Sequence, residues 1–325
     1  MLNLNQVRII DPLLTNLAHG YVSPTPGVAD FIAPPVPVSA RAGQVLQFGK
    51  EDFAIKDTKR APGANIMRTT PGYAPKLFSL YQDALGLEVP YEHIEEAEAA
   101  NLPQMQEMAL QMVLNQLMLS WENEVVGLAT TAANYESALT SSPSTKWDAT
   151  GSDPFIDIID AKEAVRSQSA IYPNSMVISP KVYHALQSNA AIRDNFQPTS
   201  SKIVDLGDLA NYFGLSRGIR VAEKVKLASD GSFEDLMADS AILFYAPPTQ
   251  SSASLSPNNS MANMGMPSFM YTYTHRDYPV VTPFRNDDDR RVIKSEVLYE
   301  HQAVITGIGA TGKAGAAYLL TDILT

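Results

Sequence analysis

The sequence predicts an α+β protein organised around one long helix. Three observations lead to this prediction. Residues 101–135 hold one continuous helical pattern, residues 153–250 alternate strand and helix patterns, and residues 44–90 and 269–299 contain short apolar segments typical of strands. The 325 residues are 45% apolar, which is enough for a substantial core.

Composition excludes several kinds of protein. The chain contains no cysteine, which rules out disulfides and thiolate metal sites. No run approaches the roughly 18 consecutive apolar residues of a membrane span. The opening segment, MLNLNQVRII, lacks the basic stretch followed by an apolar stretch that marks an export signal. We therefore expect a folded protein that is neither exported nor inserted into a membrane.

Charge is distributed unevenly along the chain, whose net charge is −11. Residues 77–145 contain ten Asp and Glu and no Lys or Arg, whereas residues 50–76 carry six Lys and Arg against three Asp and Glu. A basic segment next to an acidic one favours contact between them, within one chain or between copies. Two independently solvated surfaces are the alternative. An acidic protein is also poorly suited to tight binding of nucleic acid phosphates.

The chain begins with two extended segments. Residues 1–43 hold six prolines among large apolar side chains, too apolar for a solvated linker and too rich in proline for regular structure. We predict an arm that lies on its own body or on a neighbouring copy, with a disordered tail as the alternative. Residues 44–90 alternate apolar segments with turn formers, which predicts a long two-stranded β excursion with KDTKRAPGANIMR at its tip.

The long helix is predicted over residues 101–135. Asn101 and Gln104 have the spacing of a capping box, and Pro103 suits a first turn. A helix of this length spans about 50 Å, longer than a compact domain needs. The apolar stripe at helical spacing consists of Leu110, Leu114, Leu117, Trp121, Val125 and Leu128, widened by Met105, Met108, Met112 and Val113. The opposite, solvent side consists of Gln104, Glu107, Gln111, Asn115 and Glu122.

An α/β unit is predicted after a domain boundary near Gly151. Asp153-Pro154 has the N-cap and first-turn proline of a helix. The apolar face of this helix is predicted to contain Phe155, Ile158, Ile159, Lys162 and Val165. The elements that follow are a strand at 176–178, a helix from 180 that continues through Leu186 and Ile192, a helix at 205–212 and strands at 220–222 and 241–245. Asp157, Asp160 and Glu163 are explained by the helix dipole, and a metal or acid–base cluster is the alternative.

The last part, residues 256–325, is predicted to be β-rich. Alternating patterns at 269–274 and 293–299 predict strands joined by a polar turn at 286–289, with the long helix covering them. GIGATGKAG at 307–315 matches two phosphate-binding patterns, yet Ala314 stands where magnesium requires Ser or Thr, so a glycine turn is the preferred interpretation. The five histidines include no pair at helical metal-ligand spacing, and no nucleophile motif occurs. We predict no catalytic, cofactor or metal site.

The order of these elements, together with NSMVISPKVYHALQSNAAIRDNF, ALGLEVPYEHIEEAE and SFMYTYTHRDYPVVTPFRNDDDRRVIKSE, resembles the major capsid proteins of tailed double-stranded DNA bacteriophages, which have the Hong Kong 97 type fold. The resemblance implies five parts. These are an N-terminal arm at 1–43, an E-loop at 44–90, the spine helix and first part of a peripheral domain at 91–150, an axial domain at 151–255, and strands returning to the peripheral domain with a C-terminal strand at 256–325.

The resemblance also implies a structural protein that assembles with itself, as hexamers and pentamers, into an icosahedral shell in the host bacterial cytoplasm. Portal, scaffolding and decoration proteins are the implied partners, and the packaged double-stranded DNA is enclosed without sequence-specific binding. Arm 1–43 is expected to dock on a neighbour. The hypothesised inter-subunit contact joins Lys56, Lys59, Arg60 and Arg68 to Glu92, Glu95, Glu96 and Glu98. An encapsulin-like bacterial nanocompartment and a soluble acidic enzyme are the alternatives.

Overall fold

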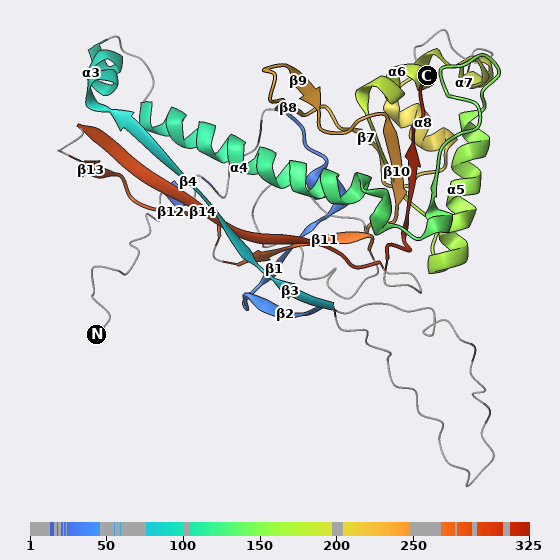
Figure 1. Cartoon of the computed structure of the whole chain (residues 1–325), viewed down its shortest axis with the longest axis horizontal. Helices are drawn as coiled ribbons and strands as arrows, with labels where there is room; N and C mark the ends of the chain where they lie inside the picture. The colour runs from blue at the N-terminus through green and yellow to red at the C-terminus, as the bar shows by residue number, and fades with distance from the viewer. Residues whose placement is uncertain are drawn as a thin grey trace.

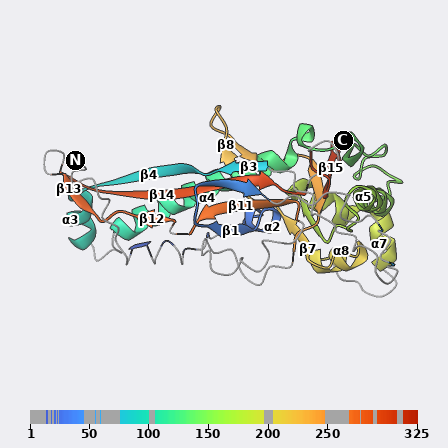
Figure 2. The same ribbon diagram turned by 90° about the horizontal axis from the view of Figure 1, so that it is seen from below.

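The computed structural model describes residues 14–15, 18, 21, 23, 25–45, 55, 59, 76–99, 105–196, 204–247, 268–276, 278–287, 291–307 and 313–325. The molecule is elongated. Helix α4 (Met105–Thr130) and the long strands β4 (Tyr81–Pro90) and β14 (Val292–Ile305) run along it, and a unit of shorter strands and helices lies at one end (Figure 1). The view from below shows β4, β14 and β12 (Val280–Val281) extending away from that unit (Figure 2).

Helix α4 confirms the predicted spine but ends earlier than expected. Its 26 residues correspond to about 39 Å. The predicted cap at Asn101 lies outside the described residues. At the other end, the hydroxyls of Thr130 and Thr131 donate to the carbonyls of Val126 and Gly127, and a short 3-10 helix, η3 (Ala132–Asn134), follows. These side chains satisfy carbonyls that a further helical turn would have used, so the prediction of helix to residue 135 was wrong.

A six-stranded sheet lies against α4, as predicted. Its path is β1 (Pro35–Val38), β11 (Met270–His275), β14 and β12, and β4 and β13 (Arg285–Asp287) also pair with β14. Apolar side chains of α4 and the sheet share one cluster, which includes Leu110, Val113, Leu114, Leu117, Leu87, Val89, Val281 and Val297. The polar turn predicted at 286–289 begins later than expected, because Asn286 and Asp287 pair with β14 in β13; residues 288 and 289 lie outside the described residues.

From residue 25 on, the predicted N-terminal arm is part of the body of the subunit. Residues Ala29–Ile32 form the short helix α2, and β1 pairs in parallel with β11. Val28, Ala29 and Ile32 are at most 1% exposed. The prediction of an arm without regular structure was therefore wrong for this segment. Here the arm lies on its own body, one of the two predicted places, and docking on a neighbour stays a prediction. Prolines 35 and 37 fit because β1 is an edge strand, where an absent N–H costs no ladder bond.

The predicted β excursion is described at its base. Strand β2 (Ala42–Val45) pairs antiparallel with β3 (Lys76–Ser79), and β4 follows directly. Apart from residues 55 and 59, residues 46–75, including most of the predicted basic tip, lie outside the described residues. At the far end of β4, helix α3 (Tyr91–Ala99) contains the predicted acidic approach to the spine.

The predicted α/β unit is built on a five-stranded sheet. Its order is β5 (Thr140–Ser141), β15 (Ala317–Thr321), β10 (Ser240–Phe244), β6 (Ser175–Ile178) and β7 (Gly218–Val221). Two strands, β5 and β15, thus come from outside residues 151–255. The helices of the unit are α5 (Pro154–Ser169), α6 (Pro180–Ser188), α7 (Ala190–Phe196) and α8 (Leu206–Tyr212). The side chain of Asp153 caps α5 and that of Asp205 caps α8, so the predicted helix starts are confirmed.

Several predicted faces were wrong in detail. Met108 and Met112 are 47% and 63% exposed, and Ile159 on α5 is 41% exposed. In the opposite sense, Glu122 was placed on the solvent side of α4 but is 2% exposed. A two-stranded ribbon, β8 (Val225–Leu227) with β9 (Phe233–Asp235), extends from the body near α4 (Figure 1).

Candidate functional site

The carboxylate of Glu122 is the centre of a polar junction between α4, the segment 27–31 and the chain after β7. Its Oε1 atom accepts hydrogen bonds from the backbone nitrogens of Val28, at 2.5 Å, and Ala29, at 3.2 Å. Its Oε2 atom lies 3.6 Å from Nζ of Lys224, whose side chain is 9% exposed. A buried carboxylate is tolerable only with such partners, because desolvating an unpaired charge is very costly.

Gly27 makes room for this carboxylate. A Cβ atom at residue 27 would lie 2.4 Å from Oε2 of Glu122 and 3.2 Å from Nζ of Lys224. The first distance is far below any ordinary contact, so a side chain here would push Glu122 off its backbone donors. Residue 27 must therefore be glycine, because the ion pair of Glu122 and Lys224 lies so close to its backbone.

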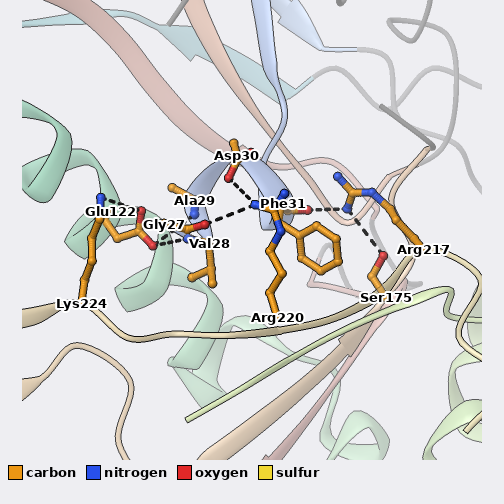
Figure 3. A network of polar contacts seen from close by, with 10 residues as sticks. All are labelled: Gly27, Val28, Ala29, Asp30, Phe31, Glu122, Ser175, Arg217, Arg220 and Lys224. Carbon is orange, nitrogen blue, oxygen red and sulfur yellow. Dashed lines mark hydrogen bonds and ion pairs between the residues drawn. The ribbon is translucent and has the colours of Figure 1, made fainter. Parts of the chain in front are cut away.

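Two arginines from the β7 region hold the same segment from the other side (Figure 3). Arg220 Nη1 donates to Asp30 Oδ1 at 2.9 Å and to the Gly27 carbonyl at 3.2 Å. Arg217 Nη1 donates to the Phe31 carbonyl at 2.6 Å. The guanidinium carbons of Arg217 and Arg220 lie 4.1 and 4.7 Å from the centroid of the Phe31 ring. Burial, together with the nearby charge of Arg220, lowers the pKa of Arg217 to about 10.

Two consecutive hydrogen bonds join the six-stranded sheet to the same segment. Trp121 Nε1 donates to Thr272 Oγ1 at 3.2 Å, and that hydroxyl donates to the Ala33 carbonyl at 3.1 Å. Trp121 and Glu122 are adjacent on α4, so one turn of the helix contacts β11, residues 27–33 and Lys224 together. This turn therefore sets how the six-stranded sheet and the five-stranded sheet are joined.

A second carboxylate of α4, Glu124, faces β14 and β4. Its Oε2 atom lies 3.1 Å from Nε2 of His301, and its Oε1 atom accepts from the Ala303 backbone nitrogen at 3.3 Å. Burial raises its pKa, but hydrogen bonds from His301 and Tyr81 outweigh that effect, so the pKa of Glu124 is lowered overall. The acidic surface predicted for the spine is therefore largely internal at this end, since both Glu122 and Glu124 have partners inside the chain.

The residues of the predicted inter-subunit contact are only partly described. Lys56, Arg60 and Arg68 lie outside the described residues, while Lys59 is described and exposed. Glu92, Glu95 and Glu96 are exposed on α3, and the side chain of Glu98 lies outside the described part. The Oε1 atom of Glu92 lies 3.6 Å from Nε of Arg291 within the same chain. The described residues therefore do not test the predicted contact, which stays a prediction.

Other predicted features have local explanations. Asp157 accepts from the indole nitrogen of the buried Trp147 at 2.8 Å, and within the described residues no group of His, Asp and Glu could hold a metal ion. A Cβ atom at Gly307 would lie 2.7 Å from the Ser268 carbonyl, so this first glycine of GIGATGKAG is required by packing. Residues 308–312 lie outside the described part. Among the described helices, none is long and apolar enough to span a membrane.

Sequence reasoning missed the Glu122 junction, although a signal was present. Met118, Glu122 and Val126 follow one another at a spacing of four, so helical periodicity alone placed Glu122 among buried residues. The prediction instead grouped Glu122 with the polar residues of the opposite, solvent side. The partners that stabilise it, Lys224 and the backbone at 28–29, are distant in sequence and could not be paired with it beforehand.

Comparison with known proteins identifies the family. The profile of the family described as Phage major capsid protein E matches residues 105–281, more than half of the chain. The chain belongs to this family. This capsid subunit is 29% identical to the major capsid protein of Burkholderia phage BcepMu over 98% of both chains. It is thus a phage major capsid protein of the kind that forms an icosahedral shell.

Solved structures agree with the family. A phage-related protein from Bordetella bronchiseptica RB50 is 27% identical to this capsid protein, with a TM-score of 0.77 over 98% of both chains. The capsid of cyanophage P-SCSP1u shares its fold with a TM-score of 0.55 at 12% identity, over 93% of this chain and 90% of that one. These likenesses confirm the predicted Hong Kong 97 type fold. Family membership also favours a structural capsid protein over the two alternatives, the encapsulin-like shell and the soluble enzyme.

Proposed function

We propose that copies of this capsid protein join through the basic excursion of one subunit, residues 44–90, and the acidic start of helix α3 in the next. Lys56, Lys59, Arg60 and Arg68 would supply the positive side, and Glu92, Glu95, Glu96 and Glu98 the negative side. The proposal is supported most directly by the position of α3, which presents exposed acids at one end of a long strand whose other end adjoins the excursion.

The base of the excursion is held firmly on its own subunit. Arg41 makes two 2.9 Å contacts, Nε to Oε2 and Nη2 to Oε1 of Glu300, and Gln82 also donates to Oε1 at 2.9 Å. Glu300 is 4% exposed in β14, so the clamp has a buried anchor. A bidentate arginine–carboxylate pair fixes orientation as well as distance. The excursion would therefore leave every subunit in the same direction, as repeated contacts in a shell require.

The acceptor side lies away from that base. Strand β4 runs ten residues from Tyr81 to Pro90, which is roughly 33 Å, before α3 begins at Tyr91. Glu95 and Glu96 are exposed there, and Glu92 shares only a half-exposed ion pair with Arg291. Exposed acids at the opposite end of the strand from a basic segment favour a contact between copies, arranged head to tail.

The five parts named from the resemblance are proposed as the domains of the subunit, with hexamers and pentamers as its assemblies. Portal, scaffolding and decoration proteins are its proposed partners, and the host bacterial cytoplasm is the proposed place of assembly. We propose no catalytic role. The exposed residues of α4 include Glu107, which is acidic, and the uncharged Met108, Gln111, Met112, Gln116 and Ser120; none of these is basic. Such a face, in a subunit with a net charge of −11, would suit a shell that encloses DNA without holding it.

The test is charge reversal followed by rescue. The double variant Lys59→Glu and Arg60→Glu should form few closed shells at physiological salt, scored by electron microscopy of purified particles. Adding Glu95→Lys and Glu96→Lys in the same chain should restore shells, because it reverses the other side of the contact. Normal shells from the first double variant, or no rescue by the second, would contradict the contact. The matched control, Lys226→Glu on the exposed ribbon, should assemble normally.

A further inference from the structure

The ribbon formed by β8 and β9 has two chemically different faces. Directly paired residues of an antiparallel ribbon share a face, and neighbours along a strand alternate between faces. Leu227 pairs with Phe233, and Lys226 pairs with Glu234. One face therefore presents two large apolar side chains, and the other presents an ion pair in which Lys226 Nζ lies 3.4 Å from Glu234 Oε2. Leu227 and Phe233 are 68% and 77% exposed, so their own subunit leaves this apolar pair in contact with solvent.

The ribbon is fixed at its root and closed at its tip. At the root, Lys224 contacts Glu122 in the buried junction, and Met237, just after β9, is fully buried. At the tip, the backbone nitrogen of Ala228 donates to the Ser232 carbonyl at 2.9 Å. The apolar pair is thus presented in a defined direction. Because an isolated two-stranded ribbon is only marginally stable in water, a surface that covers this face would stabilise it.

A second uncovered apolar surface lies on helix α4. Met108 and Met112 are 47% and 63% exposed, and residues four positions apart lie above one another on one side of a helix. The side chains that pack on the six-stranded sheet, such as Leu110 and Leu114, occupy the other side. From Met108 to Ser120, the exposed residues of α4 carry no charge. This surface can therefore be covered without taking an unpaired carboxylate out of water.

Helix α5 offers a less suitable apolar surface. Ile156 and Ile159 are 56% and 41% exposed, but Asp160 is exposed beside Ile159 and one turn after Ile156. An apolar pair that docked there would desolvate this carboxylate. Methionine side chains are also flexible and polarisable, and their sulfur atoms make favourable contacts with aromatic rings. The α4 surface is therefore the better match for Phe233 of the ribbon.

The ribbon and the methionine surface lie on the same side of the subunit. The ribbon projects from α4 away from β11 and β14 (Figure 1), and the two methionines also lie on the side of α4 opposite the sheet. Within one subunit they are apart, since Met112 precedes Glu122, at the ribbon's root, by about 15 Å along the helix. Copies in a closed shell all present the same side outwards. The ribbon of one copy can therefore meet the spine of the next.

The size of the two surfaces indicates which partner they fit. A stable complex between two free proteins buries about 1,200–2,000 Å² of surface. Two exposed side chains on each partner supply far less than this. Such a contact is sufficient only where other contacts already hold the partner nearby, because the effective concentration is then high. Copies of a capsid protein in its shell meet this condition. A second copy of this chain is therefore the partner that these surfaces fit.

We propose that the apolar face of the β8–β9 ribbon in one subunit docks on Met108 and Met112 of helix α4 in a neighbouring copy. The contact joins two different surfaces, so it repeats from one copy to the next around the assembly. The ion pair of Lys226 and Glu234 stays in water on the outer face of the ribbon. The basic excursion and helix α3 take no part, so this contact holds or fails independently of the contact proposed for them.

The test uses disulfide formation in assembled shells, which is specific because the native chain contains no cysteine. The variant with Phe233→Cys and Met112→Cys should give, on mild oxidation, a ladder of covalent oligomers on a non-reducing gel. The matched control, Lys226→Cys with Met112→Cys, has one thiol on the opposite face of the ribbon and should give no ladder. Absence of a ladder from the first pair would overturn the contact, as would an equal ladder from the control.

Two further cysteine variants distinguish other occupants of the ribbon. Phe233→Cys alone should give no covalent dimer, because a dimer would place two ribbons against each other. Phe233→Cys with Ile159→Cys should give no ladder, because a ladder would place the ribbon on α5. Either product, formed in place of the ladder with Met112→Cys, would overturn the docking on α4.

A charge substitution keeps the test decisive if the cysteine variants do not assemble. Leu227→Lys with Phe233→Glu replaces the apolar pair by a cross-strand ion pair, which preserves the ribbon. The melting temperature of the purified chain should stay within about 2 °C of the native value, because both side chains are exposed. Closed shells counted by electron microscopy should fall by about ten-fold or more, because the contact recurs in every subunit.

Met112→Lys changes the other side of the contact and should cause the same loss of closed shells. Lys226→Gln, on the outer face of the ribbon, is the control and should assemble normally. A normal yield of shells from Met112→Lys, or from the doubly substituted ribbon, would overturn the proposal.

Discussion

Glu122 and Glu124 lie two positions apart on the same helix, yet they are stabilised in different ways. Glu122 contacts the backbone of residues 28–29 and the ammonium group of Lys224. Glu124 contacts His301 and the backbone nitrogen of Ala303. Successive residues of a helix are rotated by about 100°, so the two carboxylates leave α4 in different directions and join it to different parts of the subunit.

The difference lies in how deeply the two carboxylates are buried. The side chain of Glu122 is 3% exposed and faces the Lys224 side chain, which is 9% exposed, whereas the side chain of Glu124 is 24% exposed. Breaking a buried ion pair costs more than breaking a partly exposed contact, so the joint at Glu122 is expected to contribute more to stability than the joint at Glu124.

The largest expected effect comes from breaking the joint at Glu122. Glu122→Ala would leave the buried Lys224 without its partner and two backbone N–H groups without an acceptor, at a cost of about 3–5 kcal/mol in free energy of unfolding. Urea unfolding followed by tryptophan fluorescence would measure the loss. The control is Asn123→Ala at the adjacent exposed position, expected within about 0.5 kcal/mol of the native value. Equal losses in free energy of unfolding for the two variants would contradict a stabilising role of the junction.

A smaller loss is expected from crowding the same joint. Gly27→Ala would place a Cβ atom 2.4 Å from Oε2 of Glu122, which is held in place by its other oxygen, so the cost should be about 1–3 kcal/mol. Gly127→Ala provides the contrast, because that glycine is on the exposed face of α4 with open space around it. It should stabilise the helix by about 0.5–1 kcal/mol. The two urea midpoints should therefore move in opposite directions, and a shared direction would contradict the packing argument.

The smallest expected effect concerns the joint at Glu124 in acid. The pKa of Glu124 is lower in the folded protein than its ordinary value of 4.5, so its charge stabilises the fold above that pH, and the contribution is lost as the pH falls through the lower, folded value. The melting-temperature gap between the native protein and Glu124→Gln should therefore narrow between pH 5.0 and pH 3.5. A gap that stays constant or widens over this range would contradict the lowered pKa.

Local chemistry made much of this fold predictable. Asp153-Pro154 marks the start of α5, and Asp205 starts α8, because capping involves residues within one turn of each other. The spine stripe from Leu110 to Val125 was predictable from periodicity for the same reason. The order of elements then led to the capsid fold.

Contacts between distant segments were not predictable. Residues 35–38 were expected to be irregular because of their prolines, but pairing with β11 makes them a strand in which those prolines cost little. Met108 and Met112 were expected in the core because they are apolar, yet no element covers that side of α4 among the described residues. Glu122 is the clearest case, since its burial depends on Lys224 and on a backbone segment far away in sequence.

The place of β15 in the five-stranded sheet has a consequence for how the subunit is made. Strand β15 lies between β5 and β10, but β5 ends at Ser141, β10 ends at Phe244 and β15 begins only at Ala317. During synthesis, the earlier strands must wait with an open gap in their sheet until these late residues emerge from the ribosome. Long-range pairing of this kind is slow to form and leaves strand edges exposed meanwhile. The five-stranded sheet of a nascent chain therefore stays incomplete until residues 317–321 have been made, so β5 and β10 are kept from their shared neighbour for most of synthesis.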